Sequence, residues 1–499
     1  MFVRNSNRIL ISLALGLSLC LVTVVNGDFR EDFQVNDDIG DEGQAIGPEK
    51  TSVVMKGNQV YAVWQDWRNV SDNLAPDIYF ARGTIQPDGN VTFEENVMVN
   101  DVPHSPQNDK PSSPVIAVGD DGTIYVAWTD TRNIDNQLEG VDVYFARSTN
   151  GGTSFEENKL IGSTKGGSGA PAIATSGNYV YIVYEHCCDP ANNVLNFVFS
   201  SDKGATFSDL ETIYIPSEEE NGSGQPTIAA EGNNVYIAFQ LKTKDKAVEV
   251  ALKISNNNGG TFSDPIIIND DGEDNVQQGS ISLSVSGQNI YLAWHDFRDP
   301  KGVYFTVSKD GGNSFEKNQI IVETGPNFPS PSISSYRDNV TISYGGHSEG
   351  IYGWVLLAKI SNDTGNTWSD PYMISDPDTD DPDIGPRSGI GPSSVTMCEK
   401  GMGILWVDSR GGWDNNIFFD WSDYDFDNGS EDGNGDDTDD DTGDDDTDDD
   451  DTGDDDTSDD NETEGEDKKI PGLGMFYISS AVIISLVIAI MTVGRKRRS

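Results

Sequence analysis

The sequence predicts an all-β protein: a seven-bladed β-propeller of four-stranded antiparallel blades, a disordered acidic stalk and one C-terminal transmembrane helix. Two observations predict the propeller. Short β-branched and aromatic runs recur along residues 28–424 with turn residues between them and without a helical period. An octet typified by SKDGGNSF (Ser308–Phe315) returns roughly every fifty to sixty residues. Repeated four-stranded units of this kind build propellers.

Each unit contains four strand-like runs in a fixed order. A first run such as PVIAV (Pro114–Val118) starts with proline, which costs no ladder bond at the first residue of a strand. A second run such as VYAVW (Val60–Trp64) occurs seven times, so we expect seven blades. A third run such as DVYFARS (Asp142–Ser148) precedes the octet, and a fourth such as IIIND (Ile266–Asp270) follows it.

The two ends of this region complement each other. The run DFQVND (Asp32–Asp37) matches the fourth strand of a unit, and NIFFDWS (Asn416–Ser422) matches the third. The chain therefore begins with the strand that its last unit lacks. Pairing the two would close the ring and remove two exposed strand edges.

The octet has the composition of a tight turn. Ser and Asp side chains bond nearby backbone N–H groups, Gly permits positive φ, and the aromatic ring can pack into the blade. We expect a structural role, with cation or ligand binding as the alternative. Asn150 and Asn257 replace Asp in two further copies. The three full copies contain Ser200, Asp202, Gly204 and Phe207; Ser308, Asp310, Gly312 and Phe315; and Ser361, Asp363, Gly365 and Trp368.

These octets resemble the Asp-box, or BNR, repeats of the propeller superfamily that includes sialidases, and the resemblance covers residues 30–424. It implies that ligands bind at the mouth of the central channel, on the face opposite the octets. Two features depart from the sialidase pattern. The first blade reads EKTSVVM (Glu49–Met55) where sialidases carry an Arg-Ile-Pro signature, and seven units stand where those enzymes have six blades.

A second repeated motif ends the second strand of four units as Trp-x-Asp-x-Arg. Its Asp and Arg side chains lie on one side of the strand because the strand period is two. Sialidases hold a substrate carboxylate with three arginines, so the resemblance implies ligand binding by Arg68, Arg132, Arg298 and Arg410. The alternative is a structural Asp–Arg pair within each loop. We favour it because binding sites are rarely repeated from blade to blade.

Three aromatic residues in the same loops, Trp67, Phe297 and Trp413, could stack on sugar rings and are also ligand-binding candidates. The least repetitive loop on this face is YEHCCD (Tyr184–Asp189), and Glu185 is its candidate catalytic acid or base. Tyr184 and Glu185 should point to opposite faces of their strand.

Carboxylates also end the fourth strands and could hold Ca²⁺, the one cofactor that the sequence suggests. The alternative is a solvated acidic rim, and no metal ligand is assigned. These residues are Asp37, Asp38, Asp101, Asp270, Asp271 and Asp376.

The termini predict export and anchoring. Residues 1–27 have the basic start, apolar run and small-residue end of a secretory signal peptide. Residues 425–470 are rich in Asp, Thr and Gly and predict a disordered spacer. Residues 471–494 predict a transmembrane helix, and the basic tail 495–499 predicts a cytoplasmic C-terminus. The start of the segment 471–494 also resembles an archaeal PGF-type sorting signal. This resemblance implies that the span is replaced by a lipid anchor.

Charge and cysteine content narrow the partners and the compartment. A net charge of -52 argues against nucleic acid as a partner. Cys187, Cys188 and Cys398 remain after the signal peptide, and a vicinal disulfide, free thiols or a bridge to Cys398 are all open. Seven sequons agree with an exported glycoprotein. They begin at Asn69, Asn90, Asn221, Asn339, Asn362, Asn428 and Asn461.

Three functions fit these features. The first is a cell-surface propeller that recognises glycans or another envelope polymer. The second is a sialidase-like exo-glycoside hydrolase, which would need two carboxylates about 5–10 Å apart. The third is a non-catalytic protein-interaction scaffold, which would need an apolar patch. The sequence does not indicate an oligomeric state.

Overall fold

The structure is a computed structural model in which the chain forms two units, residues 1–432 and 433–499. All of the described residues belong to the first unit. They are residues 29, 32–37, 51–68, 76–101, 111–133, 140–162, 167–186, 193–217, 220–244, 248–270, 272, 276–324, 330–346, 355–375, 393–408 and 416–423.

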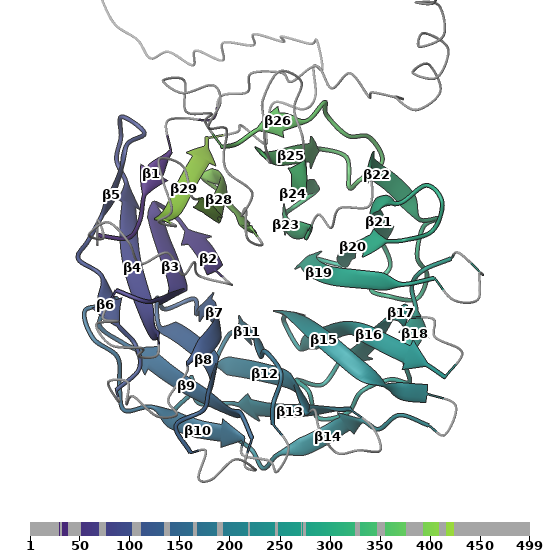
Figure 1. Ribbon diagram of the computed structural model, residues 1–499, viewed down its shortest axis with the longest axis horizontal. Coiled ribbons are helices and arrows are strands. Elements are labelled where there is room, and N and C mark those ends of the chain that lie inside the picture. The colour runs from purple at the N-terminus through teal and green to yellow at the C-terminus, as the bar shows by residue number, and fades with distance from the viewer. Residues whose placement is uncertain are drawn as a thin grey trace, which may run out of the picture. The chain divides into compact units, whose positions relative to one another are not determined.

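Seven antiparallel sheets of these residues form a ring, as predicted (Figure 1). Blades 1 to 3 contain β2 (Thr51–Lys56), β3 (Gln59–Asp66), β4 (Asp77–Ile85), β5 (Val91–Phe93) and β6 (Val97–Met98); β7 (Ser112–Val118), β8 (Ile124–Asp130), β9 (Asp142–Ser148) and β10 (Lys159–Gly162); and β11 (Ala172–Ser176), β12 (Tyr179–His186), β13 (Val194–Ser200) and β14 (Glu211–Tyr214).

Blades 4 to 6 follow the same plan. Their strands are β15 (Glu220–Glu231), β16 (Asn234–Thr243), β17 (Val248–Ser255) and β18 (Ile266–Ile267); β19 (Gln278–Ser286), β20 (Asn289–Asp296), β21 (Gly302–Ser308) and β22 (Gln319–Glu323); and β23 (Ser332–Tyr336), β24 (Asn339–Gly346), β25 (Val355–Ser361) and β26 (Tyr372–Met373). The first strand of each blade borders the centre of the ring (Figure 1).

Blade 7 closes the ring with strands from both ends of the propeller, as predicted. Its sheet contains β27 (Ser394–Cys398), β28 (Gly401–Asp408), β29 (Asn416–Ser422) and β1 (Phe33–Gln34). Phe33 pairs with Phe419, and the Val35 N–H donates to the Ile417 carbonyl at 2.8 Å. The first described strand therefore covers the outer edge of the last one.

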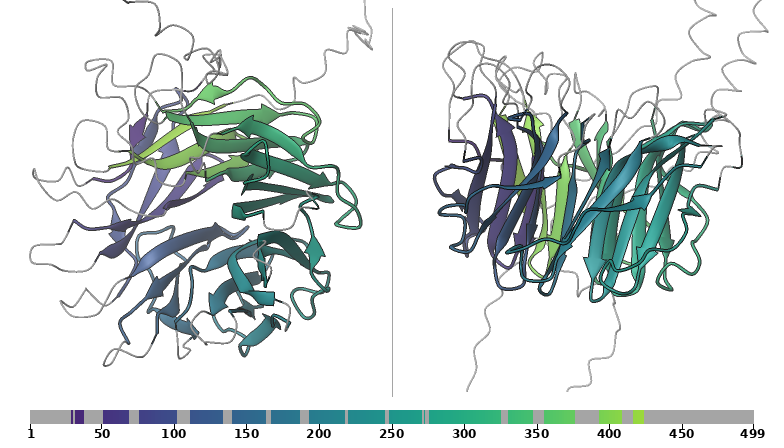
Figure 2. Two further views of the ribbon diagram at one scale, coloured as in Figure 1. Left: turned by 45° about the vertical axis from the view of Figure 1, so that its right-hand side comes forward. Right: turned by 90° about the horizontal axis from the view of Figure 1, so that it is seen from below.

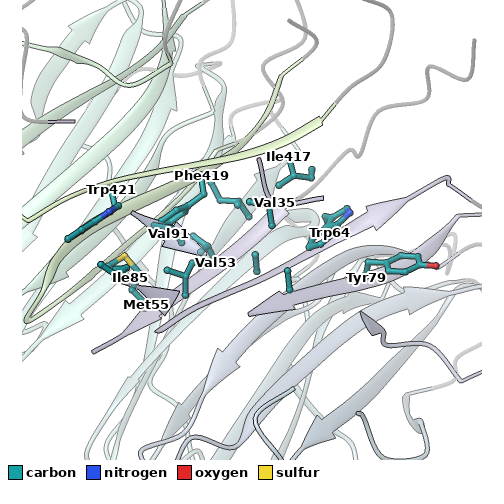
Figure 3. Packing of buried hydrophobic residues seen from close by; sticks show 14 of the residues in the cluster. Val35, Val53, Met55, Trp64, Tyr79, Ile85, Val91, Ile417, Phe419 and Trp421 are labelled. Carbon is teal, nitrogen blue, oxygen red and sulfur yellow. The ribbon is translucent and has the colours of Figure 1, made fainter. Parts of the chain in front are cut away.

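The core lies between neighbouring blades. Alternate side chains of one strand face opposite ways. Trp64 of β3 accordingly packs toward Leu405 and Phe419 of blade 7, and Val63 packs toward Trp128 of blade 2. Figure 3 shows the packing between blades 7 and 1. Both faces of each sheet are thus buried, which explains why the second strands read as continuous apolar runs.

The octets close their turns through their own side chains. In blade 5, the Ser308 hydroxyl donates to Asp310 Oδ1 at 2.8 Å and accepts from the Gly312 N–H at 2.8 Å. The backbone N–H and the hydroxyl of Ser314 both donate to the same carboxylate. Asn257 of blade 4 accepts from the Thr261 N–H through Oδ1 and donates to its hydroxyl through Nδ2.

Each octet also locks two blades together. Phe207 of blade 3 packs edge-on against Phe145 of blade 2, with ring centroids 4.9 Å apart and planes at 77°. A Cβ on Gly204, where φ is +74°, would lie 2.7 Å from Phe145 Cζ, so only glycine fits there. The same packing joins Phe155 to Phe80, Phe262 to Phe197 and Trp368 to Phe305.

Several predictions fall outside the described residues: the signal peptide, the spacer, the span 471–494, Cys187 and Cys188. The described residues contain no helix that is long and apolar enough to cross a membrane. Cys398 is a buried free thiol whose Sγ donates to the Gly57 carbonyl at 3.8 Å, so it forms no bridge.

Candidate functional site at the channel mouth

Blade 4 extends farther than its neighbours at the end of the strands opposite the octets. Its inner strand, β15, has 12 residues, whereas the inner strand of blade 3 has five. The added length pairs with the end of β16, where Gly222 lies opposite Lys242 and Glu220 lies opposite Thr243. In the side view of Figure 2 the visible strands extend from one face of the ring toward the other, so this extension lies at one face of the ring.

The extension is joined to blade 3. Asn193, at the start of the third strand of blade 3, forms a parallel bridge with Gly222. The N–H and the hydroxyl of Ser223 both donate to the Asn193 carbonyl, at 3.1 and 3.0 Å. These contacts fix the inner strand of blade 4 beside the end of β12 in blade 3.

Glu185 is the last residue but one of β12, at this seam. The Asn193 side-chain amide donates to Glu185 Oε1. The other oxygen, Oε2, lies 3.4 and 3.2 Å from the positions that a Cβ would take on Gly169 and Gly224. The Lys242 Nζ lies 2.9 Å from the same position on Gly224. We call Glu185, Asn193, Lys242, Gly169 and Gly224 the mouth site.

The mouth site places the Glu185 carboxylate and the Lys242 ammonium near the same glycine without an ion pair between them. Glu185 and Lys242 are half-buried, and within the described part of the chain Lys242 has neither an ion pair nor a hydrogen bond. Its three N–H donors therefore remain for a ligand. A Cβ on Gly224 would press against Lys242 Nζ and Glu185 Oε2, and one on Gly169 would crowd Glu185, so glycine at both positions leaves room for these polar groups. A carboxylate, an amide and an ammonium gathered at one place suit a hydroxyl-rich ligand with an acidic substituent.

Tyr184 and Glu185 point to opposite faces, as the strand period predicts. The Tyr184 side chain is fully buried against blade 2, where its hydroxyl lies beside Gly162. Burial raises the pKa of Tyr184 to about 12. The two residues therefore do not form a nucleophile pair.

The sequence predicted one residue of this site and missed Asn193 and Lys242. A signal for Lys242 was present, because the second strand of blade 4 ends FQLKT where four other blades read Trp-x-Asp-x-Arg. Where one blade departs from a repeated motif, its residues can have a binding or catalytic role that the repeated residues do not have. Asn193 carries no such signal, because its place depends on the length of β15.

The Trp-x-Asp-x-Arg motif forms a clamp between blades. In blade 2, Arg132 donates to Asp130 through Nε at 2.9 Å and Nη2 at 2.6 Å. Its Nη1 reaches Asp101 of blade 1 at 2.9 Å, and the ring of Tyr144 lies 4.2 Å from its Cζ. Asn158 and Asp101 exchange two more hydrogen bonds across the junction.

The same clamp occurs at two other junctions, with Arg68 between blades 7 and 1 and Arg298 between blades 4 and 5. Burial alone would lower the pKa of Arg68, but its hydrogen bonds with Asp66 and Asp37 raise it. These guanidinium groups lie against third and fourth strands, away from the inner strands. Their repeated structural role agrees with the alternative that we favoured, and ligand binding by them stays a prediction.

The remaining candidates are placed as follows. Trp67 and Phe297 are half-buried in the loops beside these clamps, and the Phe297 ring packs 4.4 Å from that of His295. Their ligand-binding role stays a prediction. Arg410 and Trp413 lie outside the described residues.

The carboxylates that end the fourth strands do not converge where the structure describes them. Asp37, Asp101 and Asp270 each belong to a separate clamp. No group of three or more His, Cys, Asp or Glu side chains able to hold a metal occurs among the described residues. Asp38, Asp271 and Asp376 lie outside them.

Comparison with known proteins shows the fold. No protein-family model and no curated protein matches this sequence. An ulvan lyase, solved bound to a glucuronic acid–sulfated rhamnose repeat, is 12% identical with a TM-score of 0.52, over 78% of this chain and 94% of its own. The polysaccharide lyase Uly1 is 12% identical with a TM-score of 0.50, over 79% and 97%.

A mutant NanB sialidase from Streptococcus pneumoniae is 13% identical with a TM-score of 0.44, over 78% of this chain and 70% of its own. At these identities, the likeness to the two lyases shows a shared propeller architecture and nothing of the site.

Proposed function

We propose that this propeller binds an extracellular polysaccharide at the mouth site. The observation that carries the proposal is that the Glu185 carboxylate and the Lys242 ammonium both lie beside Gly224, 3.2 and 2.9 Å from the position of a Cβ on it, without a hydrogen bond or ion pair between them among the described residues. Glu185 and Asn193 would bind sugar hydroxyls, and Lys242 would bind a carboxylate or sulfate on the glycan.

Two further features support a glycan. The site lies between two blades that lack the Arg clamp found at three other junctions, as expected for a singular site. The solved propellers with the same architecture include two polysaccharide lyases, one of them bound to an acidic repeat. We extend that ligand class to this chain as a proposal.

Glycan binding tests the proposal directly. The chain would be titrated with acidic and neutral oligosaccharides, and we expect the acidic ones to bind more tightly. Glu185→Gln and Gly224→Ala should weaken binding about tenfold or more, because one removes a charged acceptor and the other displaces the Glu185 carboxylate and the Lys242 ammonium. The control is Glu211→Gln on an exposed residue of blade 3, which should bind like wild type. Equal binding by all variants would refute the proposal.

A second candidate function is cleavage of the bound glycan. It is favoured by the approach of an ammonium and a carboxylate to the same glycine, because such a pair could move a proton. The sialidase-like hydrolase has less support, because the neighbouring Tyr184 is buried on the opposite face of β12 and cannot act with Glu185 as a nucleophile. Product release from the oligosaccharides, abolished by Glu185→Gln, would establish turnover.

We also propose that the propeller is exported and held at the cell surface. The signal peptide, the acidic spacer and the apolar segment predicted from residues 1–27, 425–470 and 471–494 support this. Protease added outside intact cells should release the propeller by cutting the spacer. A propeller found only inside the cells would contradict it.

A further inference from the structure

A depression of the surface lies on the octet face, at the opposite end of the strands from the mouth site. It is a groove of about 650 Å³ at the junction of blades 4 and 5. The octet of blade 4 supplies Asn256 and Phe262, the turn between β19 and β20 supplies Gln288, and the octet of blade 5 supplies Asn313. Sites for small ligands commonly have volumes of about 300–1,000 Å³.

This junction differs from its neighbours in how the octet packs. At the junctions where an octet ring packs edge-on, the preceding blade offers Phe80, Phe145, Phe197 or Phe305; the last three each lie three residues before their octet, and Phe80 holds the equivalent place in β4. Blade 4 has Leu252 at that position. Gly312 instead faces the aliphatic Ile254, whose Cδ1 lies 2.3 Å from the position of a Cβ on that glycine. The groove thus occurs where an aliphatic residue replaces the ring.

The groove has an apolar floor and a neutral polar rim. Ile254, Phe262 and Ile266 are half-buried on the floor. Asn256 and Gln288 are exposed on the rim, and their side-chain amides have no hydrogen-bond partner among the described residues. Asp310 also borders the groove, but its carboxylate accepts hydrogen bonds within its own turn.

This chemistry selects a neutral sugar. An amide offers both donors and acceptors to hydroxyl groups, and an aromatic floor suits the apolar face of a pyranose ring. No lysine, arginine or histidine lines the groove within the described chain, so the groove offers no cation to an anionic ligand. We infer that the groove binds one or two rings of a neutral saccharide, as a second site separate from the mouth site.

The test measures, by ligand-observed NMR, the binding of neutral mono- and disaccharides to the full chain in detergent. The probes are glucose, galactose, mannose, N-acetylglucosamine and their disaccharides. At least one should bind with a Kd on the order of 1 mM. Gln288→Ala should weaken it about three- to tenfold, and Gln288→Trp should abolish it by filling the groove. Asn178→Ala, at the matching turn of blade 3, should change nothing.

The two sites can fail independently. Glu185→Gln should leave binding in the groove unchanged, because the residue lies at the other end of the strands. A panel without a binder, or binding that survives both substitutions at Gln288, would overturn the inference. Loss of sugar binding in Glu185→Gln with full binding in Gln288→Trp would place the neutral sugar at the mouth and also overturn it.

Discussion

At the scale of single residues, the octets show what the repeated polar side chains do: they close a turn through hydrogen bonds to its backbone and to one another. Asp202 and Asp310 accept hydrogen bonds from a hydroxyl and a backbone N–H four residues on, and these bonds lower the pKa of each carboxyl to about 2. Asn makes the same turn at Asn150 and Asn257 by reversing one bond. The sequence predicted this role because the octet is complete within eight residues.

The lowered pKa gives the turns a defined pH dependence. The folded pKa of Asp310 is about 2 and the unfolded value is about 3.9, so its contribution to stability is present above pH ~4. That contribution is lost as the pH falls toward 2. We expect Asp310→Asn to lower the denaturation midpoint at pH 6 and to match wild type near pH 2. A deficit that stays constant over this range would show that ionisation of Asp310 is irrelevant.

Glycine at the octet turn should be irreplaceable for two reasons that can be separated. Gly204→Ala places a Cβ 2.7 Å from the Phe145 ring, whereas Gly177→Ala, also at positive φ, meets open space. We expect Gly204→Ala to be the more destabilising by about 1–3 kcal/mol in chemical denaturation. Equal losses would mean that φ alone accounts for the glycine.

The mouth site marks how far residue-level prediction reaches. Glu185 stood out because its loop broke the repeat, but its partner Asn193 could not be found. Their contact requires β15 to extend beside blade 3, and nothing local to Asn193 encodes that length. Lys242 could be found from the sequence, but only by comparing the ends of all seven second strands.

At the scale of elements, the Arg clamp joins three strands across a blade junction. Arg132 neutralises Asp130, which is 1% exposed, and reaches the preceding blade through Asp101. A lone arginine predicted from sequence could equally face a ligand. The structure shows that Arg132 instead contacts Asp101 of the preceding blade and Asn158 beside the fourth strand. Both residues are distant from Arg132 in sequence, so the sequence alone does not reveal these contacts.

Removing the clamp should therefore cost much more than removing a surface pair. Arg132→Met leaves the Asp130 carboxylate buried without its cation, and we expect a loss of about 3–5 kcal/mol. The control is Arg82→Met, whose partner Glu94 is half exposed, with an expected loss below about 1 kcal/mol. Unfolding by urea measures both. Similar losses in the two variants would show that the clamp adds nothing beyond a surface ion pair.

At the scale of the whole molecule, the number of blades and the closure of the ring were predictable, because both depend on counting repeats. The register of blade 4 and the groove at its junction were not, since each arises from one departure within a repeat. The outer strands also proved short, with two residues each in β1, β6, β18 and β26.

Closure by β1 should hold the ring together. A chain that starts at residue 38 lacks β1 and the buried Val35, which is 2% exposed, and leaves the edge of β29 open. We expect it to melt at a lower temperature and to associate, as seen by size-exclusion chromatography. A chain that starts at residue 28 is the control. A monomer with unchanged melting temperature would show that the ring does not need this strand.

The most direct test of the central claim is the hydrogen-exchange footprint of an acidic oligosaccharide on the full chain. Our account predicts slower exchange in the peptides that cover residues 184–186 and 220–224 on binding, with no change in the octets or in the turn at residues 286–289. Protection confined to the octet face, or bound glycan without protection at residues 184–186 and 220–224, would contradict the account.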